Sequence, residues 1–251
     1  MDMAREEKEV CRKRSCFLVD SPTWRTNEDG MVWRRVHAAI EYIRKREKRV
    51  EVRVWEESVS GYSKKNRMIL LQWMMDFCSD HGLSVETCQL AICLLDRFMS
   101  VCGSVYVNRG NLQLAGVAAL LVSVKNLESI RLCARHLLEL CGESRIEEEV
   151  CEVNALERAI LLELNWEVQC VTCVSGVCAL LECVSPLLVE AKECVMDRCN
   201  ALCSRLVLDE EYYKYELKDV CVSVLELESG LCIGERVALS CRAWVNEKAC
   251  K

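Results

Sequence analysis

The chain has 251 residues, of which 51% are hydrophobic and 29% charged, so it can bury a core and is too apolar to be a disordered chain. Its net charge of -6, with no long basic stripe, argues against DNA or RNA as the main partner. Two prolines and ten glycines provide few tight turns for a many-stranded β fold. Leu, Glu, Ala, Arg and Lys fill long stretches, which predicts an all-α protein.

The first segment, residues 1–60, is expected to be an arm with one helix. Residues 1–28 are polar and unpatterned, and a helical stripe then follows at Val32, Val36, Ala39, Ile40 and Ile43. The basic runs at 12–14 and 44–49 are either nuclear-import signals or solvated helix faces, and we favour the second interpretation. No apolar run resembles a signal peptide or reaches membrane-spanning length, so we expect an intracellular protein with no membrane association.

Residues 61–168 are predicted to form one block of five helices. The first expected helix covers residues 67–80, and the second begins after a Ser84 cap and ends at Gly103. The third covers residues 112–124, with Asn108 as its cap. The fourth covers residues 132–140, and the fifth runs to Leu164. Ser144 and Glu147 have capping-box spacing at the start of the last one. The third helix is apolar almost all round and should be the buried centre of the bundle.

A second helical block is expected over residues 169–251. Ser185-Pro186 has the pattern of a cap followed by proline at the first helical position, which predicts a long helix to about Leu208. Acidic residues 209–211 are suited to the start of the next helix, and Gly230 closes that segment. Residues 231–251 have room for one long or two short helices.

Twenty cysteines are spread along the chain. In an intracellular protein we expect their thiols to be free, and most of them occupy apolar positions of helical patterns, where Cys acts as a small hydrophobe. Cys170 and Cys173 form one CxxC pair, but no second pair or histidine follows at zinc-site spacing. We therefore predict no metal site and no cofactor.

Four segments, in order, resemble the motifs of the cyclin box. They are Asn66 to Trp73 (NRMILLQW), Leu90 to Met99 (LAICLLDRFM), Leu112 to Lys125 (LQLAGVAALLVSVK), and the helix that carries Glu157 and closes on Leu164-Asn165-Trp166. Residues 209–227 resemble a helix of a second cyclin repeat more weakly. The resemblance implies two tandem five-helix cyclin-like repeats, the second shortened or divergent, with an extra N-terminal helix. Residues 32–43 would be that helix, either crossing the second repeat and a kinase or simply capping the fold.

The sequence of residues 86–98 is most similar to that of D-type cyclins, and so is the Leu-x-Trp ending of the last helix. The chain departs from the cellular D-type pattern, because it has no Leu-x-Cys-x-Glu retinoblastoma-docking motif and no proline-rich degradation tail. Its compactness and cysteine richness resemble gammaherpesvirus-encoded cyclins, of which the murine gammaherpesvirus cyclin is one. The partner implied is a host cyclin-dependent kinase in a heterodimer, in the nucleus and cytoplasm.

Two charged residues, Arg67 and Asp96, lie in otherwise apolar helical segments. A buried charge is costly unless it is paired, so we predict that they form a structural ion pair between the first two helices of the box. The cyclin resemblance implies the same structural role.

The resemblance implies that kinase contacts are made by Lys125 and Glu157, and by their neighbourhood at Leu127 and Glu128. Without the resemblance, Lys125 and Glu157 would be interpreted as a local salt bridge or as solvated side chains at the rim of the bundle. In the family, the matching pair binds the regulatory helix of the kinase, and such groups can hydrogen-bond the backbone of a docked helix.

A substrate-docking patch is also implied by the resemblance. In cyclins a shallow groove receives substrate or inhibitor peptides with an Arg-x-Leu signal, and here it would comprise Asn66, Ile69, Leu70, Trp73, Asp76, Leu112 and Gln113. Asn66 stands where the family usually has Met, and Asp76 where it usually has Glu. The same residues could be ordinary core, and the two interpretations stay open.

No phosphate-binding glycine loop, nucleophile elbow or metal-ligand helix is found, and the three histidines are scattered. We therefore predict a non-catalytic protein. Two alternatives remain from the residues: a transcription factor of the IIB type, which would show a basic face, and a helical adaptor with no kinase partner.

Overall fold

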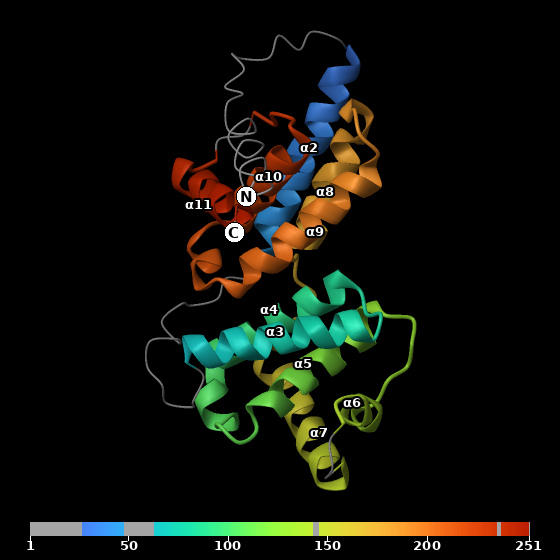
Figure 1. Cartoon of the computed structure of the whole chain (residues 1–251), viewed down its shortest axis with the longest axis vertical. Coiled ribbons are helices and arrows are strands. Elements are labelled where there is room, and N and C mark those ends of the chain that lie inside the picture. The colour runs from blue at the N-terminus through green and yellow to red at the C-terminus, as the bar shows by residue number, and fades with distance from the viewer. Residues whose placement is uncertain (1–26, 48–62, 143–145, 235–236, 251) are drawn as a thin grey trace, which may run out of the picture. The chain divides into compact units, whose positions relative to one another are not determined.

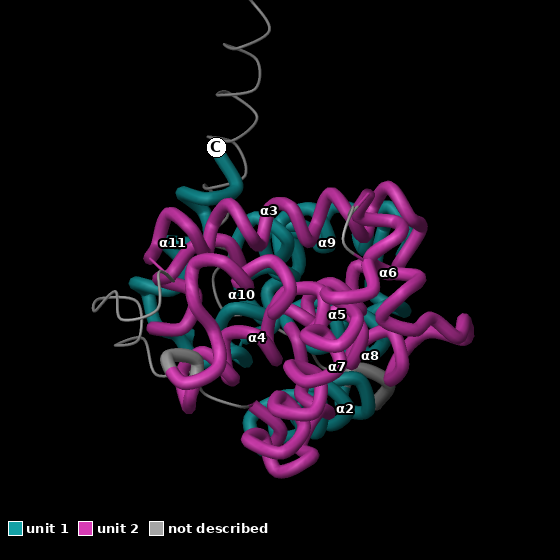
Figure 2. Tube along the Cα trace, turned by 90° about the horizontal axis from the view of Figure 1, so that it is seen from below, with its two compact units in different colours: residues 1–45, 173–206, 215–251 teal, residues 46–172, 207–214 magenta. Residues whose placement is uncertain are grey.

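The computed structural model describes residues 27–47, 63–142, 146–234 and 237–250. Those residues form ten α-helices and two short 3₁₀ helices, and no strand occurs among them. The all-α class is confirmed. The chain divides into two compact units, residues 1–45, 173–206 and 215–251 in one and residues 46–172 and 207–214 in the other (Figures 1 and 2).

The second of these units contains a five-helix bundle. Its helices are α3 (Lys64–Asp80), α4 (Val85–Tyr106), α5 (Leu112–Leu127), α6 (Ala134–Leu140) and α7 (Ile146–Glu163). Helix α5 packs against all four others and is the centre of the bundle, as its all-round apolar sequence predicts. Every residue of α5 from Leu114 to Val124 is buried.

Gly116 on α5 allows this central helix to approach α3 closely. A Cβ at this position would lie 3.1 Å from Leu70 Cδ1 and 3.5 Å from Trp73 Cζ3. Contacts of this kind leave no room for a larger side chain without a shift. The sequence motif of α5 therefore sets the spacing that places the α3 face over it.

Two local predictions in this bundle are wrong. Helix α4 continues through Gly103 to Tyr106, whose ring centroid lies 5.7 Å from that of Phe98 and whose hydroxyl donates to Glu163 Oε1 at 2.7 Å. These contacts offset the roughly 1 kcal/mol that glycine costs. Helix α5 has Asn111, not Asn108, at its N-cap position, and Asn111 Oδ1 accepts a hydrogen bond from the Asn108 N–H instead of capping the helix. Ser84 does cap α4, accepting from the Thr87 N–H at 3.1 Å. Ser144 lies outside the described residues.

The other unit contains α2 (Asn27–Arg46), α8 (Cys173–Val184), the 3₁₀ helix η2 (Ser185–Leu187), α9 (Lys192–Leu208), α10 (Leu217–Ser229) and α11 (Leu239–Ala249). Helix α10 packs on α8 and α11. Helix α2 runs beside α8 (Figure 1). It buries Val32, Val36, Ile40 and Ile43 of its predicted stripe, with Ala39 half-buried, and Ile43 lies against Gly176 of α8. A shortened second helical block with an extra N-terminal helix agrees with the predicted fold.

The long helix predicted from Ser185-Pro186 begins later. Pro186 starts only the η2 turn, and Leu188 then adopts an extended backbone. Val189 is fully exposed, and regular burial starts at Val195 and continues at Cys199 and Leu202. Helix α9 therefore begins at Lys192, where an apolar face first becomes available to the core. Gly230 ends α10, as predicted, and does so in the left-handed conformation.

The cysteines follow the apolar pattern in part. Cys199, Cys203 and Cys221 are buried, and Cys93 is half-buried. Seventeen of the described cysteines have free thiols, whereas Cys250 is disulfide-bonded, which differs from the expectation of free thiols. In the described ranges no group of three or more His, Cys, Asp or Glu side chains could hold a metal ion, and no helix is long and apolar enough to cross a membrane.

Candidate functional site

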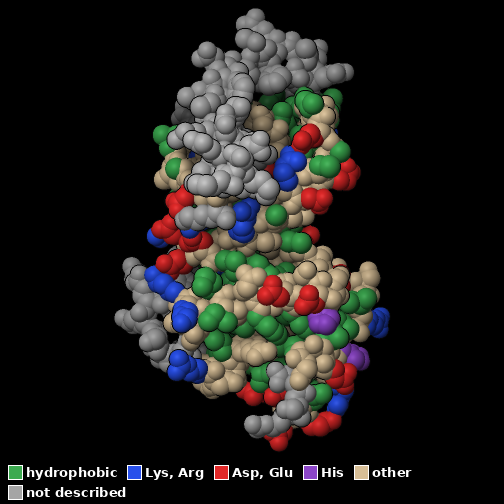
Figure 3. Space-filling model, viewed as in Figure 1, with side chains coloured by type: hydrophobic (Ala, Val, Ile, Leu, Met, Phe, Trp, Pro, Cys, Tyr) green, Lys and Arg blue, Asp and Glu red, His purple; other side chains and the backbone are tan. Residues whose placement is uncertain are grey.

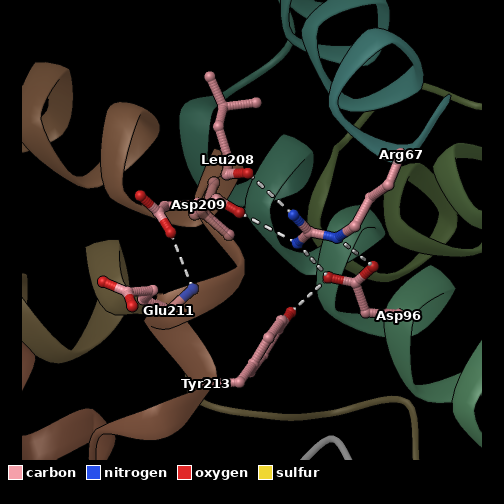
Figure 4. Close-up of polar contacts among 7 residues, drawn as sticks. Arg67, Asp96, Leu208, Asp209, Glu211 and Tyr213 are labelled. Carbon is pink, nitrogen blue, oxygen red and sulfur yellow. Dashed lines mark hydrogen bonds and ion pairs between the residues drawn. The ribbon is translucent and has the colours of Figure 1, made fainter. Parts of the chain in front are cut away.

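The residues singled out from the sequence occupy three places on the five-helix bundle. The first is a buried polar cluster between α3 and α4 (Figure 4). Arg67 Nε and Nη2 donate to the two carboxylate oxygens of Asp96 at 3.1 and 2.6 Å, and the side chains of both residues are at most 2% exposed. The two residues predicted to pair therefore form a bidentate ion pair in the core.

This cluster also holds a segment that is remote in the sequence. Arg67 Nη1 donates to the Leu208 carbonyl and Nη2 to the Val207 carbonyl, both at 3.0 Å, and the Tyr213 hydroxyl donates to Asp96 Oδ2 at 2.5 Å. Tyr213 lies in the 3₁₀ helix η3 (Glu210–Lys214), where Asp209 Oδ1 accepts from the Glu211 N–H (Figure 4). Burial and the Asp96 charge raise the pKa of Tyr213, so its hydroxyl remains a donor.

Tyr213 and the two carbonyls were not found from the sequence. The weak resemblance of residues 209–227 to a repeat helix carried no sign of a partner more than a hundred residues away. The structural role predicted for Arg67 and Asp96 thus extends to anchoring residues 207–214 on the bundle.

The second place is the end of α5 and the neighbouring face of α7. Lys125 Nζ contacts Glu157 Oε1 at 2.6 Å, and the Lys125 side chain is 48% exposed while that of Glu157 is 15% exposed. Leu127, two residues further on, is 42% exposed. The structure therefore brings together an ion pair and an exposed apolar side chain, an arrangement that can offer both hydrogen bonds and apolar contact to another protein.

Glu128, predicted to lie in the same contact region, has partners inside the chain. Its Oε1 accepts from the Ser84 N–H at 2.9 Å and from Thr87 Oγ1 at 2.6 Å. These hydrogen bonds, that of Thr87 first, lower the pKa of Glu128. Its carboxylate thus stabilises the N-terminus of α4, which is a role that the sequence did not reveal.

The third place is the face of α3 that lies over the start of α5. Ile69 is 54% exposed, Trp73 and Asn66 are half-buried, and Leu70 and Leu112 are buried. Asp76 and Gln113 are exposed, and Asp76 Oδ1 accepts from Gln72 Nε2 at 2.9 Å. Hydrophobic side chains gather along α3 and α5 in the space-filling view, with acidic groups beside them (Figure 3). This face has the character of a shallow apolar surface with an acidic rim.

Comparison with known proteins identifies what this bundle resembles. The model of the cyclin N-terminal domain matches residues 38–169. The chain is 31% identical to a G2/mitotic-specific cyclin-B3 of Gallus gallus over 129 residues, which are 51% of this chain and 30% of that protein. It is 30% identical to a G1/S-specific cyclin-E1 of the same species over 152 residues, 61% of this chain and 34% of that protein. The chain thus spans about a third of these relatives.

Two solved structures have a similar fold. A viral cyclin from herpesvirus saimiri superimposes with a TM-score of 0.63 at 16% identity, covering 87% of this chain and 96% of that one. A chain of the CAK complex of Chaetomium thermophilum superimposes with a TM-score of 0.52 at 13% identity, covering 97% of this chain and 71% of that one.

Proposed function

Because the chain belongs to the cyclin family, we propose that it is a non-catalytic regulatory subunit that binds and activates a host cyclin-dependent protein kinase. The Lys125–Glu157 pair is the observation that carries this proposal. The pair sits at an edge of the bundle with its ammonium half exposed, beside the exposed Leu127. A docked helix can accept hydrogen bonds from Lys125 and donate to Glu157 while it covers the apolar side chain.

The mechanism proposed is conformational. The cyclin packs on the kinase helix that carries a catalytic Glu, and this completes the Lys–Glu ion pair that positions ATP and lets the activation loop become ordered. The cyclin contributes tighter binding to the active state of the kinase, so that its effect is a population shift. Catalysis stays with the kinase.

A charge swap tests the contact without removing the ion pair. In the double variant Lys125→Glu with Glu157→Lys, the two side chains can still pair with each other, but a partner meets reversed donors and acceptors. We expect loss of kinase co-purification from host lysate and of histone kinase activity, with helicity by circular dichroism unchanged. The double variant Lys125→Ala with Glu157→Ala should lose binding in the same way.

The matched control is the exposed Lys192–Glu182 pair of the other unit. Its double alanine variant should bind the kinase as the unchanged chain does, because exposed pairs contribute at most about 1 kcal/mol to stability. Kinase binding that survives the Lys125/Glu157 swap at full strength would remove the assignment. An intact chain that captures no kinase at all would favour a helical adaptor.

We also propose that the α3 face is a docking site for Arg-x-Leu peptides of substrates or inhibitors. The exposed Ile69 and the half-buried Trp73 supply apolar area for the leucine, and Asp76 supplies a charge for the arginine. Ile69→Ala should weaken binding of a labelled Arg-x-Leu peptide about tenfold. Val101→Ala, which trims an exposed side chain of α4, should not change it. Equal affinities for both variants would contradict the docking site.

Within the family, the sequence of residues 86–98 supports a D-type-like cyclin, and the compactness and cysteine richness of the chain support one encoded by a gammaherpesvirus. We propose that it acts in the host nucleus and cytoplasm. A tagged chain expressed in host cells should then be recovered from both fractions together with its kinase. Recovery from one of the two fractions alone would contradict the localisation.

A further inference from the structure

Two thiols of the five-helix bundle lie within contact distance of each other. Cys93 on α4 and Cys170 in the segment after α7 have their sulfur atoms 3.1 Å apart, and they are 77 positions apart in the sequence. Both residues are half-buried, so they lie nearer to solvent than the fully buried thiols of the chain. The regulatory function proposed above makes no use of either residue.

A second contact fixes the segment that carries Cys170 against α4. Arg97, one turn after Cys93 on α4, donates from Nη1 to the Glu167 carbonyl at 2.8 Å, and Glu167 precedes Cys170 by three residues. Arg97 is itself buried. The segment that carries Cys170 is therefore attached to α4 beside the thiol pair, so a bond between the sulfurs requires little movement of the backbone.

We propose that Cys93 and Cys170 are an oxidation site at which a peroxide forms an intramolecular disulfide. The Cys170 sulfur attacks one oxygen of hydrogen peroxide, which releases water and leaves a sulfenic acid on Cys170. The Cys93 sulfur then attacks the Cys170 sulfur and releases a second water. The two thiols lose two electrons and two protons, and the peroxide takes them up.

The order of the two steps follows from the environment of Cys93. The hydrogen bond with Cys170, and then burial, raise the pKa of the Cys93 thiol. A raised pKa disfavours Cys93 as the first nucleophile, because the thiolate is the nucleophilic form, so we assign the first attack to Cys170. In reducing compartments such bonds are transient and reversible, as a regulatory modification requires.

The chain has an internal comparison pair. Cys173 on α8 and Cys203 on α9 have sulfur atoms 3.2 Å apart, but both residues are completely buried. Proximity alone would predict oxidation of both pairs. Access by peroxide predicts oxidation of Cys93–Cys170 and not of Cys173–Cys203.

The test treats the full chain with graded doses of hydrogen peroxide and removes the peroxide with catalase. The chain is then unfolded in urea with N-ethylmaleimide, which blocks all remaining thiols, and disulfides are mapped by mass spectrometry of a non-reducing digest. We expect a Cys93–Cys170 cross-link that dithiothreitol removes, with Cys173 and Cys203 still recovered as blocked thiols. Because the bond closes a long loop, the melting temperature of the oxidised chain should rise by roughly 10 °C.

Two variants complete the design. Cys170→Ser should show no peroxide-dependent rise in melting temperature, and Cys93→Ser should accumulate a sulfenic acid on Cys170 that dimedone traps. The proposal is overturned if no Cys93–Cys170 cross-link forms at doses that oxidise the exposed Cys151, or if Cys173–Cys203 is oxidised to the same extent. Either result is read from the unchanged chain and does not depend on the folding of a variant.

Discussion

Replacing Asp96 with alanine is the sharpest test of how this fold is held together. Asp96 is fully buried and accepts three hydrogen bonds, two from Arg67 and one from the Tyr213 hydroxyl. Asp96→Ala removes both acceptor oxygens, and with them these three hydrogen bonds, and leaves a guanidinium that is 2% exposed without its carboxylate. The carbonyls of Val207 and Leu208 still accept from Arg67, but neither carries the negative charge of a carboxylate.

The size of the effect follows from this burial. Breaking a buried ion pair by removal of one partner costs about 3–5 kcal/mol, since the remaining charge cannot return to water. In a chain of this size each kcal/mol lowers the melting temperature by about 2–4 °C, so Asp96→Ala should lower it by roughly 6–20 °C. The double variant Arg67→Met with Asp96→Leu removes both charges and should be less destabilised than Asp96→Ala.

Thermal unfolding followed by circular dichroism measures these differences. Asp76→Ala is the matched control, because this acid lies on the exposed side of α3 and its loss should change stability by no more than about 0.5 kcal/mol. A melting temperature for Asp96→Ala within about 2 °C of that control would refute the reasoning that the cluster carries a buried charge pair. A double variant less stable than Asp96→Ala would show that shape, and not charge, governs the site.

Three further outcomes follow. The hydrogen bonds of Glu128 lower its folded-state pKa, so its contribution to stability is present above the ordinary carboxyl pKa of 4.5 and is lost as the pH falls through the lower folded pKa. Glu128→Gln lacks this titration, so its melting temperature should fall less than that of the unchanged chain when the pH is lowered below 4.5. Gly176→Ala places a Cβ 2.7 Å from the Cys221 sulfur and should lower the free energy of unfolding by about 1–3 kcal/mol. Gly30→Ala meets nothing within 4 Å and should stabilise α2, and urea titrations of both variants measure the difference. Tyr213→Phe removes one hydrogen bond to a charged acceptor and should cost about 1.5–3 kcal/mol, so a midpoint equal to that of the unchanged chain would contradict the anchoring role of residues 207–214.

Helix existence could be read from the sequence because it depends on local periodicity. The centre of the bundle is an example, since α5 is apolar on every side and any compact arrangement must bury it. Helix ends were less predictable. Gly103 and Pro186 both favour a helix end locally, but α4 continues past Gly103 to Tyr106, which contacts Phe98 and Glu163. The helix expected after Pro186 begins only where an apolar face meets the core.

The candidate site shows the same division. Arg67 and Asp96 could be paired from the sequence, because two opposite charges in apolar helices have few other ways to be buried. Glu128 could not be distinguished from its neighbour Lys125 as a contact residue, since its partners Ser84 and Thr87 are more than forty positions away.

By itself the sequence determined that this chain is all-α, that it contains a cyclin box, and which charges the core must pair. Only the tertiary structure decided that residues 207–214 are anchored on Arg67 and Asp96, that Glu128 stabilises α4, and that Cys170 lies against Cys93. The physical reason is the sequence separation over which each kind of interaction acts. Helical periodicity and capping act within a few residues, whereas these contacts join positions 41 to 141 residues apart and exist only once the helices have packed.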